Sequence, residues 1–127
     1  MVNLQADDLT IEVDERTPGR LGLGWLGRSN ARNPGSILHP WFEQLFREAK
    51  ERKMAIDMNF EKLEYFNSST VAVLIQLISS ARDRHITMSI RYDARLRWQA
   101  LSFDALKRVL KTFDSNGGTP AVSIVSR

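Results

Sequence analysis

The chain has 127 residues, of which 43% are hydrophobic and 26% are charged, a composition typical of a single globular domain. It contains no cysteine, which excludes disulfides, thiol catalysis and thiolate metal sites, and two histidines are too few for an ordinary zinc site. We therefore expect neither a metal nor a cofactor. No stretch approaches the about 20 apolar residues of a membrane span, and residues 1–8 lack the features of a signal peptide, which predicts a cytoplasmic protein.

The net charge of +3 is unevenly distributed. Residues 82–111 hold eight Lys or Arg against three Asp, so the remainder of the chain is slightly acidic. Such a region binds an acidic protein, a phosphate or a nucleic acid, or it is simply a solvated basic face. Composition alone leaves these interpretations open.

The first third of the chain predicts a hairpin followed by a loop. Residues 9–13 alternate with a period of two, residues 17–19 have turn chemistry, and residues 21–26 form a second apolar run interrupted by glycines. Residues 28–36 have no periodicity and predict the longest ordered loop. We therefore divide the domain into an N-terminal hairpin and loop, residues 1–37, and an α/β core, residues 38–127.

Helical and strand patterns then alternate. A first helix is predicted to begin near Pro40 and end near Lys53, with one apolar face: Trp41, Phe42, Leu45, Phe46 and Ala49. Residues 54–60 predict a strand. A second helix follows residue 66 and carries a second apolar stripe: Val71, Leu74, Ile75, Ile78 and Ala81.

The last third repeats this alternation. Residues 86–92 predict a strand, residues 97–111 a third helix and residues 121–125 a final strand. The third helix is predicted to bury one stripe: Leu101, Ala105, Leu106, Val109 and Leu110. Strand-helix-strand units require parallel pairing, whereas a hairpin is antiparallel. The order ββαβαβαβ thus predicts a single α/β domain with a mixed sheet and about three helices.

Two motifs suggest catalysis or ligand binding but lack the required context. Residues 22–27 match the glycine spacing G-x-G-x-x-G, but no helix follows to receive a pyrophosphate, so we interpret them as glycines of a strand or bulge. Asp57, Glu61 and Glu64 lie close in sequence, without an accompanying nucleophile and base. We interpret these carboxylates as a solvated loop edge, and expect no enzymatic activity.

The run from Asn67 to Thr70 is the most informative feature, because it places four small polar side chains at the start of the second helix. Asn or Ser there is explained by an N-cap. Four such residues exceed what one cap requires, and a helix N-terminus also tolerates phosphate. The run is therefore either a cap alone or a cap with a phosphate acceptor.

Residues 54–58, followed by residues 63–74, resemble the central strand, loop and helix start of STAS domains of the anti-sigma-factor-antagonist type. In that family an Asp-Ser-Ser-Gly run begins the helix, and its first serine corresponds to Ser68. Here Asn67 replaces the Asp and Thr70 replaces the Gly. This variant, with residues 91–95, is similar to SiaC-like regulatory phosphoproteins, which have a STAS-like fold.

The resemblance implies a bacterial protein without catalytic activity, whose binding to an effector is switched by a serine/threonine kinase and a PP2C-type phosphatase. The kinase is expected to be a histidine-kinase-like ATPase. Ser68 is the expected acceptor, Ser69 and Thr70 are the fallback acceptors, and Asn67 caps or orients the site. Neither a membrane nor a nucleic acid is expected as a partner.

We expect partner binding to extend to neighbouring surface, with anchors at Arg91, Arg95 and Trp98. Trp98 is equally compatible with the core. The alternative interpretation is an unmodified interaction or anionic-ligand module that uses the basic region of residues 82–111.

Overall fold

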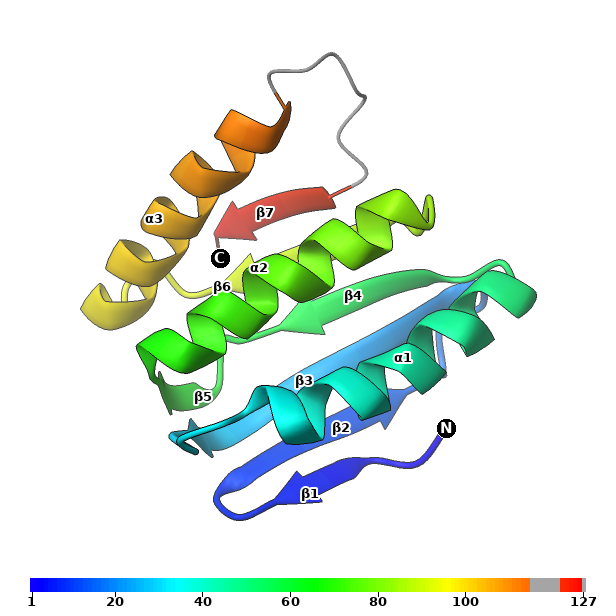
Figure 1. Ribbon diagram of the computed structural model, residues 1–127, viewed down its shortest axis with the longest axis horizontal. Helices are drawn as coiled ribbons and strands as arrows, with labels where there is room; N and C mark the ends of the chain where they lie inside the picture. The colour runs from blue at the N-terminus through cyan, green and yellow to red at the C-terminus, as the bar shows by residue number, and fades with distance from the viewer. Residues whose placement is uncertain (115–121, 127) are drawn as a thin grey trace.

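The computed structural model describes residues 1–114 and 122–126 (Figure 1). The elements are, in chain order, β1 (Leu4–Ala6), β2 (Leu9–Asp14), β3 (Arg20–Ser29), α1 (Gly35–Glu51), β4 (Ala55–Asn59), β5 (Leu63–Phe66), α2 (Ser68–Asp83), β6 (Met88–Tyr92), α3 (Arg97–Asp114) and β7 (Val122–Ser126). No helix among these residues is both long and apolar enough to cross a membrane.

The strands form one mixed sheet of seven strands in the order β1-β2-β3-β4-β6-β7, with β5 paired to the end of β3. β1, β2 and β3 are antiparallel neighbours, whereas β3, β4, β6 and β7 are parallel. The predicted α/β class, mixed sheet, N-terminal hairpin and three helices are therefore confirmed. The hairpin is continuous with the core, because β3 also pairs with β4 and β5.

One face of the sheet carries the core and all the helices. The register aligns one row of apolar side chains across four parallel strands: Leu23, Met58, Ile90 and Ile124. Two strand positions further on, Trp25 lies on the same face and contacts Phe42 of α1. Tyr92 likewise stacks on Phe103 of α3. α2 lies beside α1 on this face, as Figure 1 shows.

The opposite face has no helix over it within the described residues, and it is polar. Side chains alternate along a strand, so the intervening rows point to this second face: Gly22, Asp57, Ser89 and Ser123, and then Gly24, Asn59, Arg91 and Val125. Together with the β2–β3 turn, all of these positions except Ser123 line a hollow of about 880 Å³. We call this side the uncovered face.

The short strands β1 and β5 were not predicted, and the loop predicted before α1 is shorter than expected. β3 continues to Ser29 because Gly27 takes a positive φ of 81° at a shift in register, and a side chain there would collide with the Asp8 carbonyl. This confirms the strand-or-bulge interpretation of the glycines. β5 has buried residues at its two ends only, Leu63 and Phe66, so it shows no alternation. The connection before α1 is only residues 30–34.

The helices differ from their predictions in start and orientation. α1 begins at Gly35, so Pro40 lies inside it, while the five predicted apolar residues are all buried as expected. In α2, Leu74, Ile78 and Ala81 are buried as predicted, whereas Val71 and Ile75 are only half-buried.

The prediction for α3 was wrong for three of its five residues. Leu101, Ala105 and Val109 are exposed, and the buried row is instead Gln99, Phe103, Leu106 and Leu110. Leu106 and Leu110 are buried as predicted. α3 carries apolar residues on two sides, so the prediction from periodicity combined residues of both sides.

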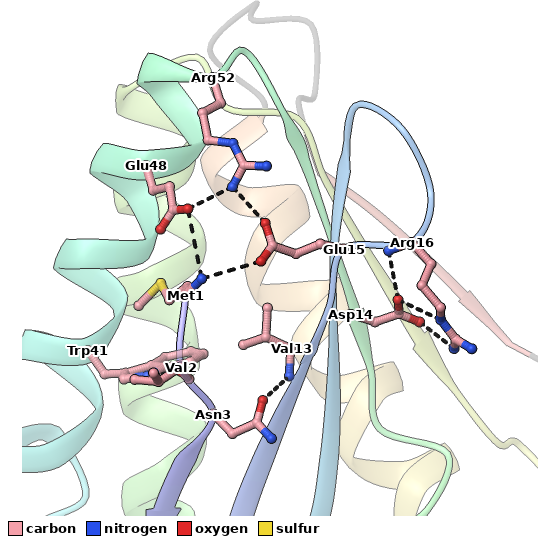
Figure 2. A network of polar contacts seen from close by, with 10 residues as sticks. All are labelled: Met1, Val2, Asn3, Val13, Asp14, Glu15, Arg16, Trp41, Glu48 and Arg52. Atoms are coloured by element: carbon pink, nitrogen blue, oxygen red, sulfur yellow. Dashed lines mark hydrogen bonds and ion pairs between the residues drawn. The ribbon is translucent and has the colours of Figure 1, made fainter.

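The start of the chain is held against the β2–β3 turn and α1 by ion pairs (Figure 2). The amino group of Met1 lies 3.3 Å from Glu15 and 3.9 Å from Glu48. Arg52 donates to both carboxylates, at 2.6 and 2.7 Å. The hydrogen bond from Arg52 lowers the pKa of Glu15. These contacts join three segments at one edge of the molecule.

Candidate functional site at the start of α2

Asn67 is the N-cap of α2. Its backbone is extended, with φ of −89° and ψ of 173°, and its side-chain Oδ1 accepts a hydrogen bond of 2.9 Å from the Thr70 N–H. Its Nδ2 donates at 2.9 Å to the Ala31 carbonyl, in the connection before α1. One side chain therefore satisfies the third amide of the helix and also holds the neighbouring loop.

The three hydroxyl groups after Asn67 have different environments. Ser68 and Ser69 are exposed, whereas Thr70 is fully buried. The Thr70 hydroxyl lies 2.7 Å from the Ser29 hydroxyl and donates to Asn67 Oδ1 at 2.7 Å. In this fold Thr70 is out of reach of a kinase, so the structure disfavours it as a fallback acceptor and gives it a role in packing.

The three expected partner-binding residues lie on different surfaces. Arg91 lies on the uncovered face, 4.0 Å from Glu61. Arg95, in the connection before α3, binds both oxygens of Asp93 at 3.0 Å, and this hydrogen bonding raises the pKa of Arg95. Trp98 is on the helix-covered side. The structure thus separates Arg91 from Trp98 by the thickness of the sheet.

Trp98 combines the two roles that the sequence left open. Its ring is half-buried and lies edge-on to Phe66, with 5.2 Å between the ring centroids. Phe66 immediately precedes Asn67, so Trp98 contacts the residue that leads into α2. Trp98 therefore supports the core and also contributes surface beside the helix start.

The basic residues of 82–111 do not gather on one surface. Arg84 donates to Glu43 of α1 at 2.6 Å, at the far end of α2 from Ser68. Lys107 donates to the Tyr92 hydroxyl at 2.8 Å, and Arg91 lies on the uncovered face. This dispersal offers little support for an anion-binding module built from the whole region.

The acidic residues considered for catalysis have different environments, and Glu61 lies 4.0 Å from Arg91. Asp57 accepts hydrogen bonds from Arg20 and Ser89 on the uncovered face, which lowers its pKa below 3.8. Glu64 is exposed on β5. In the part of the chain that the structure describes, no group of three His, Asp or Glu residues is placed to hold a metal ion.

Two residues that sequence reasoning missed hold the site together. Ser29 was assigned to a loop, yet it ends β3 and contacts Thr70. Gln99 is fully buried, and its amide nitrogen Nε2 donates at 2.7 Å to the Phe60 carbonyl. Its Oε1 accepts a bond of 2.7 Å from the Asp93 N–H. Hydrophobic periodicity detects only apolar residues, so it does not reveal a buried polar residue such as Gln99.

Comparison with known proteins finds no matching protein-family model and no matching curated protein. The function is therefore argued from the geometry of the site and from the resemblance of its motif.

Proposed function

We propose that the protein is a non-enzymatic bacterial regulatory switch of the cytoplasm, whose partner binding is controlled by reversible phosphorylation of Ser68. The observation that carries the proposal is that Ser68 is exposed and is the first residue of α2, directly after the Asn67 cap. A phosphate there adds a charge of about −1.5 to −2 beside the positive end of the helix dipole. The helix start thus favours the modified state electrostatically.

The choice of Ser68 rests on exposure and on position. Thr70 is buried and bonded, which leaves the two serines as accessible hydroxyls of this run. Of these, Ser68 corresponds to the serine that is phosphorylated in the STAS domains that the motif resembles. Ser69 stays the fallback acceptor and serves as the matched control.

Modification of Ser68 is expected to change the surface and to leave the fold intact. The cap bond runs from Thr70 to Asn67 and does not involve the Ser68 hydroxyl. A histidine-kinase-like kinase and a PP2C-type phosphatase would set the occupancy, and an effector protein would read it. These three partners rest on the resemblance, whereas the acceptor also rests on geometry.

The test is intact-mass analysis and peptide mapping of the protein isolated from its native cells under several growth conditions. One phosphate on Ser68, with an occupancy that varies, is the expected result. A Ser68→Ala variant should lose the modification, and Ser69→Ala should retain it. Protein that stays unmodified in the presence of phosphatase inhibitors, or that is modified only elsewhere, would overturn the proposal.

A further inference from the structure

The outer side of α3 carries a row of apolar residues that the fold does not bury. Leu101 is 62% exposed and Val109 is 38% exposed, Ala105 is exposed, and Trp98 is half-buried. The intervals of three, four and four residues place them along one side of the helix. We call these four residues the α3 stripe. Such spacing is typical of the face through which one helix packs on another.

The α3 stripe begins beside the proposed phosphorylation site. Trp98 contacts Phe66, two residues before Ser68, and Figure 1 shows α2 and α3 starting at the same end of the sheet. The side of α2 toward α1 is identified by the hydrogen bond between Gln76 and His39.

Half-buried apolar residues of α2 lie on its other side. Val71 and Ile75 follow Ser68 at intervals of three and four residues, so all three share one side of α2, away from α1. Because α3 is the neighbour of α2 on that side, Ser68, these two residues and the α3 stripe belong to one continuous surface.

The charges beside the α3 stripe indicate what binds it. Arg97, Arg108 and Lys111 are exposed on the solvent side of α3, with Asp104 as the acidic residue among them. A ligand with acidic residues beside its apolar face would complement this net positive charge. A second copy of the chain would bring the same positive charge to the contact, so the charges disfavour self-association.

We propose that the α3 stripe is the docking surface for an amphipathic helix of the effector whose apolar face is bordered by Asp and Glu. The inference rests on the proposed function, because Ser68 lies at one end of the same surface and a phosphate on Ser68 would change the charge of that surface. Apolar anchors at helical spacing provide the affinity, and the basic border provides the orientation and the preference for an acidic partner.

Three synthetic helical peptides test this proposal. The first has an apolar face bordered by Glu, the second has the same face bordered by Lys, and the third keeps the Glu border but has Ser in place of the apolar residues. Fluorescence anisotropy gives the affinities, and amide chemical shifts locate the binding. We expect the first peptide to bind at residues 96–109 at least about tenfold more tightly than either of the others.

Two variants and a matched control identify the residues involved. Leu101→Glu and Val109→Glu should each weaken binding of the first peptide about tenfold or more, since each places an acidic group among the anchors. Val125→Glu, at a 47% exposed apolar residue on the uncovered face, should leave binding unchanged. Because Leu101 is exposed, its variant should unfold at the wild-type urea concentration, and Leu101→Met should retain binding.

The proposal is overturned if the Glu- and Lys-bordered peptides bind equally, if the first peptide does not bind, or if Leu101→Glu has no effect. It is also overturned if sedimentation velocity shows a dimer that Leu101→Glu dissociates, because a second copy would then occupy the stripe. The occupancy of phosphate on Ser68 is measured separately by mass. Binding at the stripe without modification would therefore reject the switch alone, and modification without binding would reject the docking surface alone.

Discussion

The side-chain hydroxyls of Ser29 and Thr70 lie 2.7 Å apart, in a buried contact between the end of β3 and the first turn of α2. The Ser29 carbonyl also accepts a bond of 3.0 Å from the Asn67 N–H. The strand therefore holds the helix start through both main chain and side chain. These contacts therefore help to fix the position of Ser68.

Thr70→Val is expected to lower the free energy of unfolding by about 1–3 kcal/mol, because it leaves the buried Ser29 hydroxyl without its partner. Urea unfolding measures this value. Ser29→Ala combined with Thr70→Val should lower stability by less than the sum of the single changes. Additive effects would contradict a direct interaction. Ser69→Ala, on the exposed neighbour, should stay within about 0.5 kcal/mol of wild type.

Asn67→Ala is expected to lower the free energy of unfolding by about 0.5–2 kcal/mol, since it removes the cap of α2 and the bond to Ala31. Asn67→Asp keeps an acceptor for the Thr70 amide and places a negative charge at the helix start, so it should be less destabilising. Chemical denaturation compares the two variants. Both variants lose the bond to Ala31, so a larger loss for Asp than for Ala would contradict the cap role assigned to this side chain.

Ser68→Asp is expected to raise the free energy of unfolding by about 0.3–1 kcal/mol at low ionic strength, because the carboxylate lies beside the positive end of the helix dipole. The gain should diminish as salt is added. Urea unfolding at two ionic strengths measures both effects. Ser68→Ala, which adds no charge, is the control and should show no such salt dependence. A destabilising Ser68→Asp would argue that this helix start does not favour a phosphate.

Asp57 is expected to make the stability of the protein depend on acidic pH. Its hydrogen bonds from Arg20 and Ser89 lower its pKa from the ordinary 3.8. The stabilisation is therefore fully present above the unfolded pKa, and it is lost as the pH falls through the lower folded pKa. Asp57→Asn should be less stable than wild type at neutral pH, and the difference should shrink below about pH 4.

Urea unfolding midpoints across this pH range test that expectation. Asp104→Asn, at an exposed carboxylate of α3, is the control and should change stability little. A difference between wild type and Asp57→Asn that stayed constant down to the lowest pH would contradict the assigned role of the ionised carboxylate.

Gln99→Leu is expected to lower the free energy of unfolding by about 1–3 kcal/mol, because the buried Asp93 N–H would lose the side-chain oxygen that accepts its hydrogen bond. The Phe60 carbonyl would lose one of its two donors and keep the bond from the Leu63 N–H. The same exchange at Gln44, which is exposed on α1, should have little effect. Equal stability of Gln99→Leu and wild type would mean that another group or a water molecule accepts the hydrogen bond of the Asp93 N–H in the variant.

The main architecture was predictable because amphipathic patterns identify elements that bury one side. The core face of α1 follows directly from its spacing, and the parallel units follow from strand-helix alternation. β5 was not predictable, since a four-residue strand without alternation resembles a loop. The continuation of β3 was also hidden, because it depends on the positive φ of Gly27 and on the nearby Asp8 carbonyl.

The site was predictable only in part. A run of small polar residues before an apolar helix predicts a helix start, and Asn67 with Ser68 indeed begins α2. What local sequence did not distinguish is which hydroxyl points inward, because Ser68 and Thr70 differ only in their place on the helix. The long-range contact with Ser29 decides this, and a separation of 41 residues leaves no local pattern. The same limit applies to α3, where two apolar sides compete.

The uncovered face offers a practical advantage for studying the molecule. Ser123 is an exposed residue on that face, and the natural chain contains no cysteine. Ser123→Cys would therefore provide a unique thiol for attaching a fluorophore or a surface tether. The attached group would lie across the sheet from Ser68 and from the α3 stripe, so either could be assayed on immobilised or labelled protein without blocking it.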